Sequence, residues 1–188
     1  MLMLVLGLFI WSAVHLFPSL APARRRQLVS RLGDNAYQGI FALFVIAGLL
    51  LIVFGWRSTD PTHLYTPLAE MRHPAMLLAV AGFILMVAAS FPTRLKRIIR
   101  HPQLTGVLLW AVAHLLLNGD SRSLLVFATL AAWSVVSMLA INRRDGAWVK
   151  PVIQGGWGRE AVMIVSGLII SAVVVRFHEY LSGVALVS

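Results

Sequence analysis

The chain has 188 residues, of which 59% are hydrophobic and only 12% are charged, and its mean hydropathy is +0.83. A soluble domain of this length cannot bury so much apolar surface, so the composition excludes a soluble globular protein and predicts an integral membrane protein. The net charge of +9 is spread over short segments between apolar stretches. We therefore interpret it as a feature of membrane topology and exclude nucleic acid as a partner.

In chain order, the sequence contains apolar segments that are long enough to cross roughly 30 Å of hydrocarbon as helices. They cover residues 3–20, 38–56, 73–91, 102–118, 124–141 and 161–180, and the fourth is short. The expected fold class is all-α: a polytopic membrane helical bundle of about six transmembrane helices, formed by a single domain over residues 1–188. The first segment resembles a signal peptide, but it lacks a basic n-region and a clear cleavage site, so we expect a helix that is retained.

The positive residues predict the orientation of this bundle. Of the sixteen Lys and Arg residues, four lie in each of the connections that follow the first, third and fifth spans, and four lie in the rest of the chain. Positive residues are enriched in cytoplasmic loops. These three connections are therefore expected inside, and both termini outside.

Cysteine is absent from the sequence. Its absence excludes thiolate-held iron–sulfur clusters, zinc thiolate sites, disulfides and covalently attached c-type haem. A bound metal or cofactor must then be held by histidine, carboxylate, methionine or backbone atoms.

Two of the six histidines stand inside apolar spans: His15 in the first and His114 in the fourth. The other four can reach water, namely His63, His73, His101 and His178. Each histidine inside a span follows a tryptophan by four residues, Trp11 or Trp110, on a helical stripe that should face the bundle interior. One interpretation is that each histidine forms a hydrogen bond between helices. The other is that the two histidines share one site. With a rise of about 1.5 Å per residue their depths in the membrane differ by roughly 6 Å, which allows such a site.

Two imidazoles facing each other across a helical bundle suit a b-type haem with bis-histidine axial ligation. Tryptophan and aliphatic side chains would pack on the macrocycle. Arg97 and Arg100, at the edge of the fourth span, would pair with its propionates. Copper or zinc fits less well, because these metals usually bind a third or fourth protein ligand and no other histidine lies at the same depth in the membrane.

The run RHPQ…G…WA…H…NGD between residues 100 and 120, together with the early histidine of the first span, resembles the NnrU family of bacterial membrane proteins. The resemblance covers nearly the whole chain and implies a multi-pass protein of the bacterial inner membrane. The same domain occurs in the plant 15-cis-zeta-carotene isomerase, whose haem b ligands correspond by motif to His15 and His114. That isomerase has a cysteine three residues before its second ligand, implicated in a redox-dependent ligand switch. Ala111 stands at that position here, which argues against such a switch.

On this basis His15 and His114 are the expected metal ligands of haem b. The candidate cofactor-binding residues around them are Trp11, Trp110, Arg97, Arg100, His101 and Gln103. The bacterial family is associated with denitrification and nitric oxide metabolism, so the expected partners are membrane lipid and either nitric oxide or a lipophilic small molecule. The resemblance assigns no catalytic residue. The enzymatic alternatives that it implies are an isomerase and an oxidoreductase.

The sequence leaves other functions open. The tripeptide RHP with Gly106 four residues later also resembles membrane methyltransferases of the isoprenylcysteine carboxyl methyltransferase type, which bind S-adenosylmethionine. Those enzymes carry acidic residues and a Gly-aromatic run after the next span, where this chain has NRRDGAWVKPV. A lipid methyltransferase and a structural assembly factor are therefore the alternatives. Asp120, just before the fifth span, is predicted to cap that helix rather than to act in catalysis.

Overall fold

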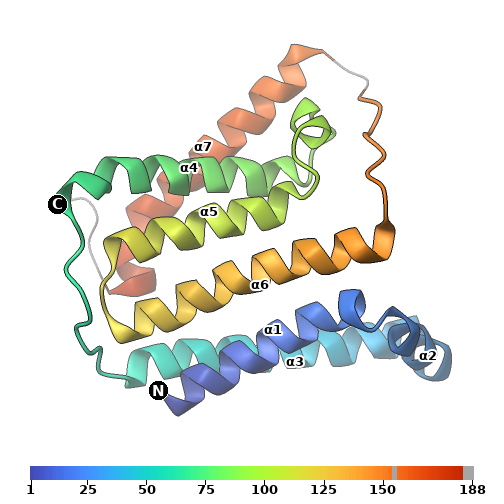
Figure 1. Cartoon of the computed structure of the whole chain (residues 1–188), viewed down its shortest axis with the longest axis horizontal. Helices are drawn as coiled ribbons and strands as arrows, with labels where there is room; N and C mark the ends of the chain where they lie inside the picture. Colours follow the sequence, from blue (N-terminus) through green and yellow to red (C-terminus); the bar gives the residue numbers. More distant parts are fainter. Residues whose placement is uncertain (154–155, 184–188) are drawn as a thin grey trace. The chain divides into compact units, whose positions relative to one another are not determined.

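The computed structural model describes residues 1–153 and 156–183, and helices make up nearly all of its regular structure (Figure 1). The longer helices are α1 (Leu2–Leu20), α2 (Pro22–Leu32), α3 (Asp34–Ser58), α4 (Arg72–Ala88), α5 (Pro102–Leu117), α6 (Ser121–Asp145) and α7 (Trp157–Ser182). Two short 3-10 helices, η1 (Ala69–Met71) and η2 (Arg94–Arg97), lie before α4 and α5. In the described part of the chain, β pairing is limited to an isolated bridge between His63 and Asp120. The predicted all-α class is confirmed.

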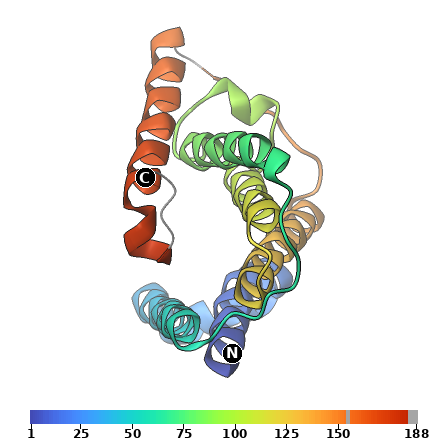
Figure 2. The ribbon, with the colours of Figure 1, turned by 90° about the vertical axis from the view of Figure 1, so that its left-hand side faces the viewer.

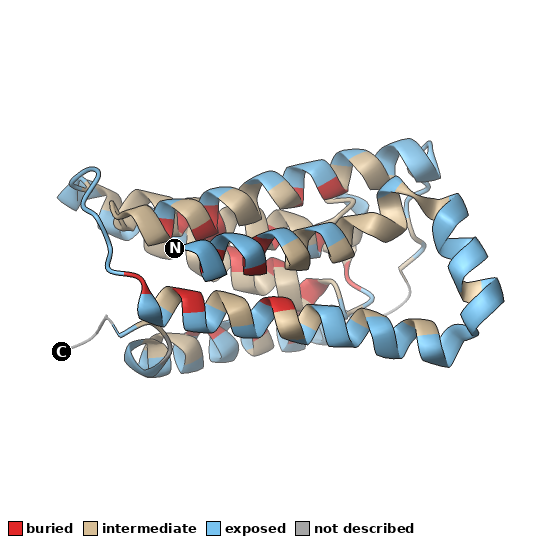
Figure 3. Cartoon of the chain, turned by 90° about the horizontal axis from the view of Figure 1, so that it is seen from below, coloured by how far each residue is buried: buried red, intermediate tan, exposed pale blue. Residues whose placement is uncertain are grey.

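The six predicted spans correspond to α1, α3, α4, α5, α6 and α7. Five of these helices, the exception being α5, are long and apolar enough to cross a membrane. The 16 residues of α5 are apolar but rise only about 24 Å, as expected for a short fourth span. Exposed residues, pale blue in Figure 3, run along the outer faces of the helices, and many are large and apolar, such as Leu43 and Phe54. The chain is thus a helical membrane protein whose outer surface suits lipid.

The structure adds a helix, α2, in the arginine-rich segment after the first span, where the sequence predicts a connecting loop. Pro22 stands in its first turn, where the missing N–H group does no harm, and arginine and leucine favour helix. Gly33, with a φ of +83°, ends α2 and allows the chain to turn into α3. The exposed arginines of α2 make it too polar to lie in hydrocarbon, so it does not add a span.

The helices form two compact units. Unit 1 combines Met1–Thr66 with Asn118–Gly146 and contains α1, α2, α3 and α6. Unit 2 combines Pro67–Leu117 with Ala147–Ser188, described here as far as residue 183, and contains α4, α5 and α7. The same helices can be followed from a second direction in Figure 2.

Glycines bring the backbones of α1 and α3 together in unit 1. A Cβ atom added at Gly7 would lie 2.7 Å from the backbone nitrogen of Ile52, and one added at Gly48 would lie 3.1 Å from the backbone nitrogen of Trp11. A Cβ atom at Gly55 would meet the backbone of Leu4. Small residues at such contacts let membrane helices approach closely and gain packing energy.

The segment after α3 and the turn before α6 are joined by hydrogen bonds in the same unit. The backbone N–H groups of Leu64 and Tyr65 donate to the Gly119 carbonyl, at 2.8 and 3.1 Å. The Tyr65 hydroxyl donates to the Asn118 carbonyl at 2.8 Å. These bonds fix the position from which α6 begins.

Unit 2 is held together by a glycine contact and a buried carboxylate. Gly82 of α4 and Gly106 of α5 face each other, and a Cβ atom at Gly106 would lie 2.5 Å from the Gly82 carbonyl oxygen. At the start of α7, the buried Glu160 accepts hydrogen bonds from the Thr93 hydroxyl and, at 2.9 Å, from the Arg94 backbone N–H. The α7 helix is thereby tied to the loop that precedes α5.

Candidate functional site

His15 is held in a defined orientation in the C-terminal half of α1. Its Nδ1 atom lies 2.7 Å from the backbone carbonyl oxygen of Trp11, one helical turn earlier. A carbonyl only accepts hydrogen bonds, so Nδ1 carries the proton and the lone pair of the ring is on Nε2. The Trp11 ring packs on the imidazole with centroids 4.0 Å apart. The tautomer and the rotation of the ring are both fixed by α1 alone.

The other helices of unit 1 enclose His15 with aromatic rings. Phe41 of α3 meets it edge-on with ring centroids 5.6 Å apart, and Trp133 of α6 does so at 5.8 Å. Trp133 also contacts Trp11, with centroids 4.9 Å apart. The half-buried His15 is therefore surrounded by side chains from α1, α3 and α6.

Several side-chain polar atoms of unit 1 are buried and have no hydrogen-bond partner among the described residues. They are Ser12 Oγ, Tyr37 Oη, Arg122 Nε, Trp133 Nε1 and Ser137 Oγ. Buried polar groups usually have partners, and unpaired ones cost free energy or indicate a bound group. Trp133 Nε1 belongs to a ring that contacts His15, so one of these groups lies in the immediate surroundings of the histidine.

His114 in unit 2 repeats the local arrangement. Its Nδ1 atom donates to the Trp110 carbonyl oxygen at 2.8 Å, and the Trp110 ring lies 4.6 Å away between centroids. As at His15, the proton is on Nδ1 and the lone pair of the ring is on Nε2. The ring of His178, from α7, lies near it with centroids 6.3 Å apart and planes at 27°. The two Trp-x-x-x-His stripes predicted from the sequence therefore also form the same hydrogen bond, from the histidine to the tryptophan carbonyl.

The family model described as NnrU protein matches residues 3–186. The chain belongs to the NnrU family. The match covers nearly all of the chain and supports the first of the two resemblances described above. No curated protein and no solved structure matches the chain.

The glycines of this NnrU-family chain also position the two histidine-bearing helices. Gly48 of α3 lies against the backbone of Trp11, and Gly82 of α4 lies against the backbone of Trp110, where an added Cβ atom would be 3.2 Å from the nitrogen. In each unit the helix with the histidine thus rests on a neighbouring helix at the tryptophan one turn before it. Close backbone packing limits the ways in which the tryptophan and histidine can move.

His15 and His114 each present a single imidazole donor rather than a member of a cluster of ligands. Within residues 1–153 and 156–183, no three His, Asp or Glu side chains gather as a metal-binding group. Zinc sites use three or four protein ligands, whereas axial ligation of haem needs only two imidazoles. Metal-binding histidines almost always donate their other ring N–H to a carbonyl or carboxylate, as His15 and His114 do.

The remaining candidate residues lie in the segment that leads into α5. Arg97, at the end of η2, and Gln103, in the first turn of α5, are exposed. Arg100 and His101 are half-buried, and the His101 carbonyl accepts the Thr105 N–H at 2.9 Å. His101 therefore lies directly before α5, and Gln103 is exposed in its first turn.

His178, expected from the sequence to reach water, is half-buried, and its ring also lies near that of His114. The Ser182 hydroxyl donates to the His178 carbonyl at 2.9 Å and lies 3.0 Å from its Nδ1 atom. The sequence does carry a signal, since Ser171 and His178 are polar residues of an apolar span and their spacing of seven places them on one face of the helix. Phe41 and Trp133 had no such signal.

Asp120 caps α6, as predicted. Its Oδ1 atom accepts the backbone N–H groups of Arg122 and Ser123, both at 3.0 Å. Partial burial disfavours the charged carboxylate, but hydrogen bonds from the Ser123 hydroxyl and from these two amides outweigh it, and Arg122 adds a positive charge. The pKa of Asp120 therefore lies below its usual value. This environment keeps Asp120 ionised, which suits a helix cap.

Proposed function

We propose that this NnrU-family protein is a haem-b-binding protein of the bacterial inner membrane in which His15 and His114 are the axial ligands. The observation that carries the proposal is the hydrogen bond from each Nδ1–H to the carbonyl of the tryptophan four residues earlier. This bond places the lone pair of both imidazoles on Nε2 and raises their basicity, as expected of metal ligands.

The protein residues have separate roles in this proposal. Trp11 and Trp110 orient the imidazoles and shield them from lipid and water. Arg97 and Arg100 are the candidate partners of the propionates, and His101 and Gln103, at the start of α5, are the further candidates. A haem held by two imidazoles supplies one-electron chemistry or a response to a gas such as nitric oxide.

Two kinds of activity are consistent with such a cofactor. The first is a redox or nitric-oxide-related function in denitrification, and the second is isomerisation of a lipophilic substrate. The family resemblance assigns no catalytic side chain. We therefore favour a function that depends on the haem itself.

The test is the absorption spectrum of the detergent-purified protein, oxidised and reduced. Bis-imidazole ligation gives low-spin iron with a sharp α-band in the reduced state. His15→Ala and His114→Ala should each convert this spectrum to a high-spin form or lose the haem. His63→Ala and His73→Ala are matched controls, since both residues are exposed, and they should keep it.

Two results would contradict the proposal. One is a double variant, His15→Ala with His114→Ala, that retains a full complement of low-spin haem. The other is a wild-type protein that has no haem after expression with sufficient iron and binds S-adenosylmethionine in a calorimetric titration. The second result would favour the methyltransferase alternative, whose RHP and Gly106 elements are present at the start of α5.

A further inference from the structure

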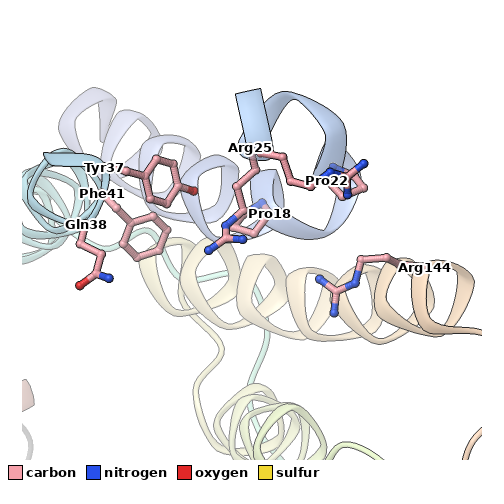
Figure 4. A pocket seen from close by; sticks show the side chains of 8 residues that line it. Pro18, Pro22, Arg25, Tyr37, Gln38, Phe41 and Arg144 are labelled. Carbon is pink, nitrogen blue, oxygen red and sulfur yellow. The ribbon is translucent and has the colours of Figure 1, made fainter. Parts of the chain in front are cut away.

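Unit 1 contains an open pocket at the end of the bundle where the arginine-rich connections lie. It has a volume of about 680 Å³ and is formed where α1 ends, α2 and α3 begin, and α6 ends. Its lining includes Pro18, Arg25, Tyr37, Phe41 and Arg144, labelled in Figure 4, and also Arg26. All of them belong to unit 1.

The pocket is strongly positive. Three guanidinium groups line it, from Arg25, Arg26 and Arg144, and none of its lining residues is acidic. Arg144 forms an exposed bidentate pair with Asp145, with 2.6 Å between Nε and Oδ1 and 3.1 Å between Nη2 and Oδ2, and this pair partly balances its charge. In the described part of the chain, Arg25 and Arg26 form no ion pair. This concentration of positive charge favours an anionic ligand.

A hydrogen-bond donor is available in the same place. The Tyr37 hydroxyl is buried and has no hydrogen-bond partner among residues 1–153 and 156–183, although its ring lies 5.4 Å from the Arg25 guanidinium carbon. Figure 4 shows the hydroxyl directed toward the guanidinium group of Arg25. A buried hydroxyl without a partner costs free energy, which a ligand oxygen accepting its proton would recover. The pocket therefore offers charge and a directed O–H group to one anion.

The position of the pocket indicates where that anion comes from. The spans α1, α3 and α6 all enter or leave the membrane at this end, and the polar helix α2 lies beside them. Connections rich in arginine are expected on the cytoplasmic side, where anionic lipid headgroups are concentrated. Ile40 and Phe44, about one and two turns further into α3 than Tyr37, are exposed by 44% and 50%. They provide an apolar surface for acyl chains directly beyond the charged groups.

We propose that this pocket binds the phosphate group of an anionic phospholipid. Arg25, Arg26 and Arg144 pair with the phosphate, and the Tyr37 hydroxyl donates a hydrogen bond to one of its oxygens. The acyl chains follow the exposed apolar face of α3. The bound lipid would link α2 to α3 and α6 at the membrane surface, and the proposal is independent of haem binding.

The test compares lipid retention by native mass spectrometry after reconstitution in phosphatidylcholine nanodiscs with and without phosphatidylglycerol. The pocket variant is Arg25→Gln with Arg26→Gln and Arg144→Gln. The matched control is Arg24→Gln with Arg31→Gln and Arg143→Gln, which removes the same charge from α2 and α6 outside the pocket. The pocket variant should retain phosphatidylglycerol at least about tenfold more weakly than the control, because charge-assisted contacts to the phosphate are lost. Tyr37→Phe should weaken retention by about threefold or more, since only the hydroxyl is removed.

Three outcomes would overturn the proposal. The first is equal phosphatidylglycerol retention by the pocket variant and its control. The second is stabilisation of the wild type by millimolar inorganic phosphate that displaces phosphatidylglycerol, which would assign the pocket to a soluble anion. The third is loss of haem absorbance from the pocket variant while lipid retention is unchanged, which would assign the arginines to propionates. Circular dichroism and size-exclusion chromatography confirm the fold of each variant.

Discussion

A single added methyl group between α4 and α5 should destabilise unit 2. In Gly106→Ala, the new Cβ atom would lie 2.5 Å from the Gly82 carbonyl oxygen and 3.0 Å from the Met86 nitrogen. Both are backbone atoms, so neither can rotate away. Reaching an ordinary contact of 3.4 Å requires the helices to separate locally by about 0.9 Å, which forfeits up to roughly half of the dispersion energy between the atoms concerned.

Two opposing contributions decide whether Gly106→Ala raises or lowers the free energy of unfolding. Replacing glycine by alanine inside a helix favours folding by about 1 kcal/mol. Overpacking a tight contact costs about 1–3 kcal/mol, and the upper part of that range applies where backbone is the obstacle. We expect a net loss of about 1–2 kcal/mol, or a melting temperature lower by about 2–8 °C for a chain of this size. Since Trp110 and His114 follow Gly106 by one and two turns, haem content should fall as well.

Gly39→Ala is the matched control, because Gly39 lies in α3 with no atom within 4 Å of its added Cβ position. It should leave the melting temperature of the detergent-purified protein unchanged or raise it. The reasoning about close packing would be refuted if Gly106→Ala stabilised the protein as much as Gly39→Ala does.

Three further predictions concern the ends of the helices. Asp120→Ala should lower the stability by about 1 kcal/mol at pH 7, since it removes the cap of α6. The depressed pKa of Asp120 stabilises the fold above its unfolded pKa of about 3.9, and this contribution is lost as the pH falls through the folded pKa. The stability difference between Asp120→Ala and the wild type should therefore shrink below about pH 4. A difference in melting temperature that stays constant across this pH range would contradict the prediction. Arg122→Lys should cost about 1 kcal/mol, because Nη1 donates to the carbonyls of Trp56 and Thr59 at the end of α3, at 3.0 and 3.1 Å, and an ammonium lacks the planar fork. Arg143→Lys, which keeps an exposed charge on α6, should not change the melting temperature. A C-terminal alkaline phosphatase fusion should be active, as the distribution of arginine predicts an outer C-terminus, and a fluorescent cytoplasmic reporter there would contradict that topology.

The spans could be predicted from the sequence because lipid imposes a strong local rule. Each of the six apolar segments had to satisfy its own backbone hydrogen bonds, so composition and length alone indicated helices. The bond from His15 Nδ1 to the Trp11 carbonyl is local in the same sense, since residues four apart lie on one face of a helix. The histidine stripes and the Asp120 cap could therefore be predicted from the sequence.

What could not be predicted depends on contacts between distant segments. The Arg25 and Tyr37 pair joins α2 to α3, and Trp133 reaches His15 from a helix more than one hundred residues later. Neither pairing leaves a periodic pattern in the sequence. The α2 helix was missed for a different reason: a run of arginines after an apolar span is interpreted as a loop when only membrane spans are sought, although arginine favours helix.

His178 provides the last and sharpest test of the ligand assignment. The single proton of the Ser182 hydroxyl is donated to the His178 carbonyl, so its oxygen accepts the Nδ1–H group, and the lone pair of His178 is on Nε2 as well. His178 therefore has the chemistry of a ligand and lies beside His114. Its orientation depends on Ser182, the last residue of α7, where helix ends fray, whereas that of His15 depends on a carbonyl inside a span.

We therefore expect His178→Ala to keep low-spin haem, with at most a small shift of the α-band, and His15→Ala to lose it. Reduced-minus-oxidised spectra of the two variants, purified in parallel, decide between the two pairs of histidines. If His178→Ala became high-spin while His15→Ala kept its α-band, the ligands would be His114 and His178. The iron would then be held within unit 2 alone, and the aromatic enclosure of His15 by Phe41 and Trp133 would need a different explanation.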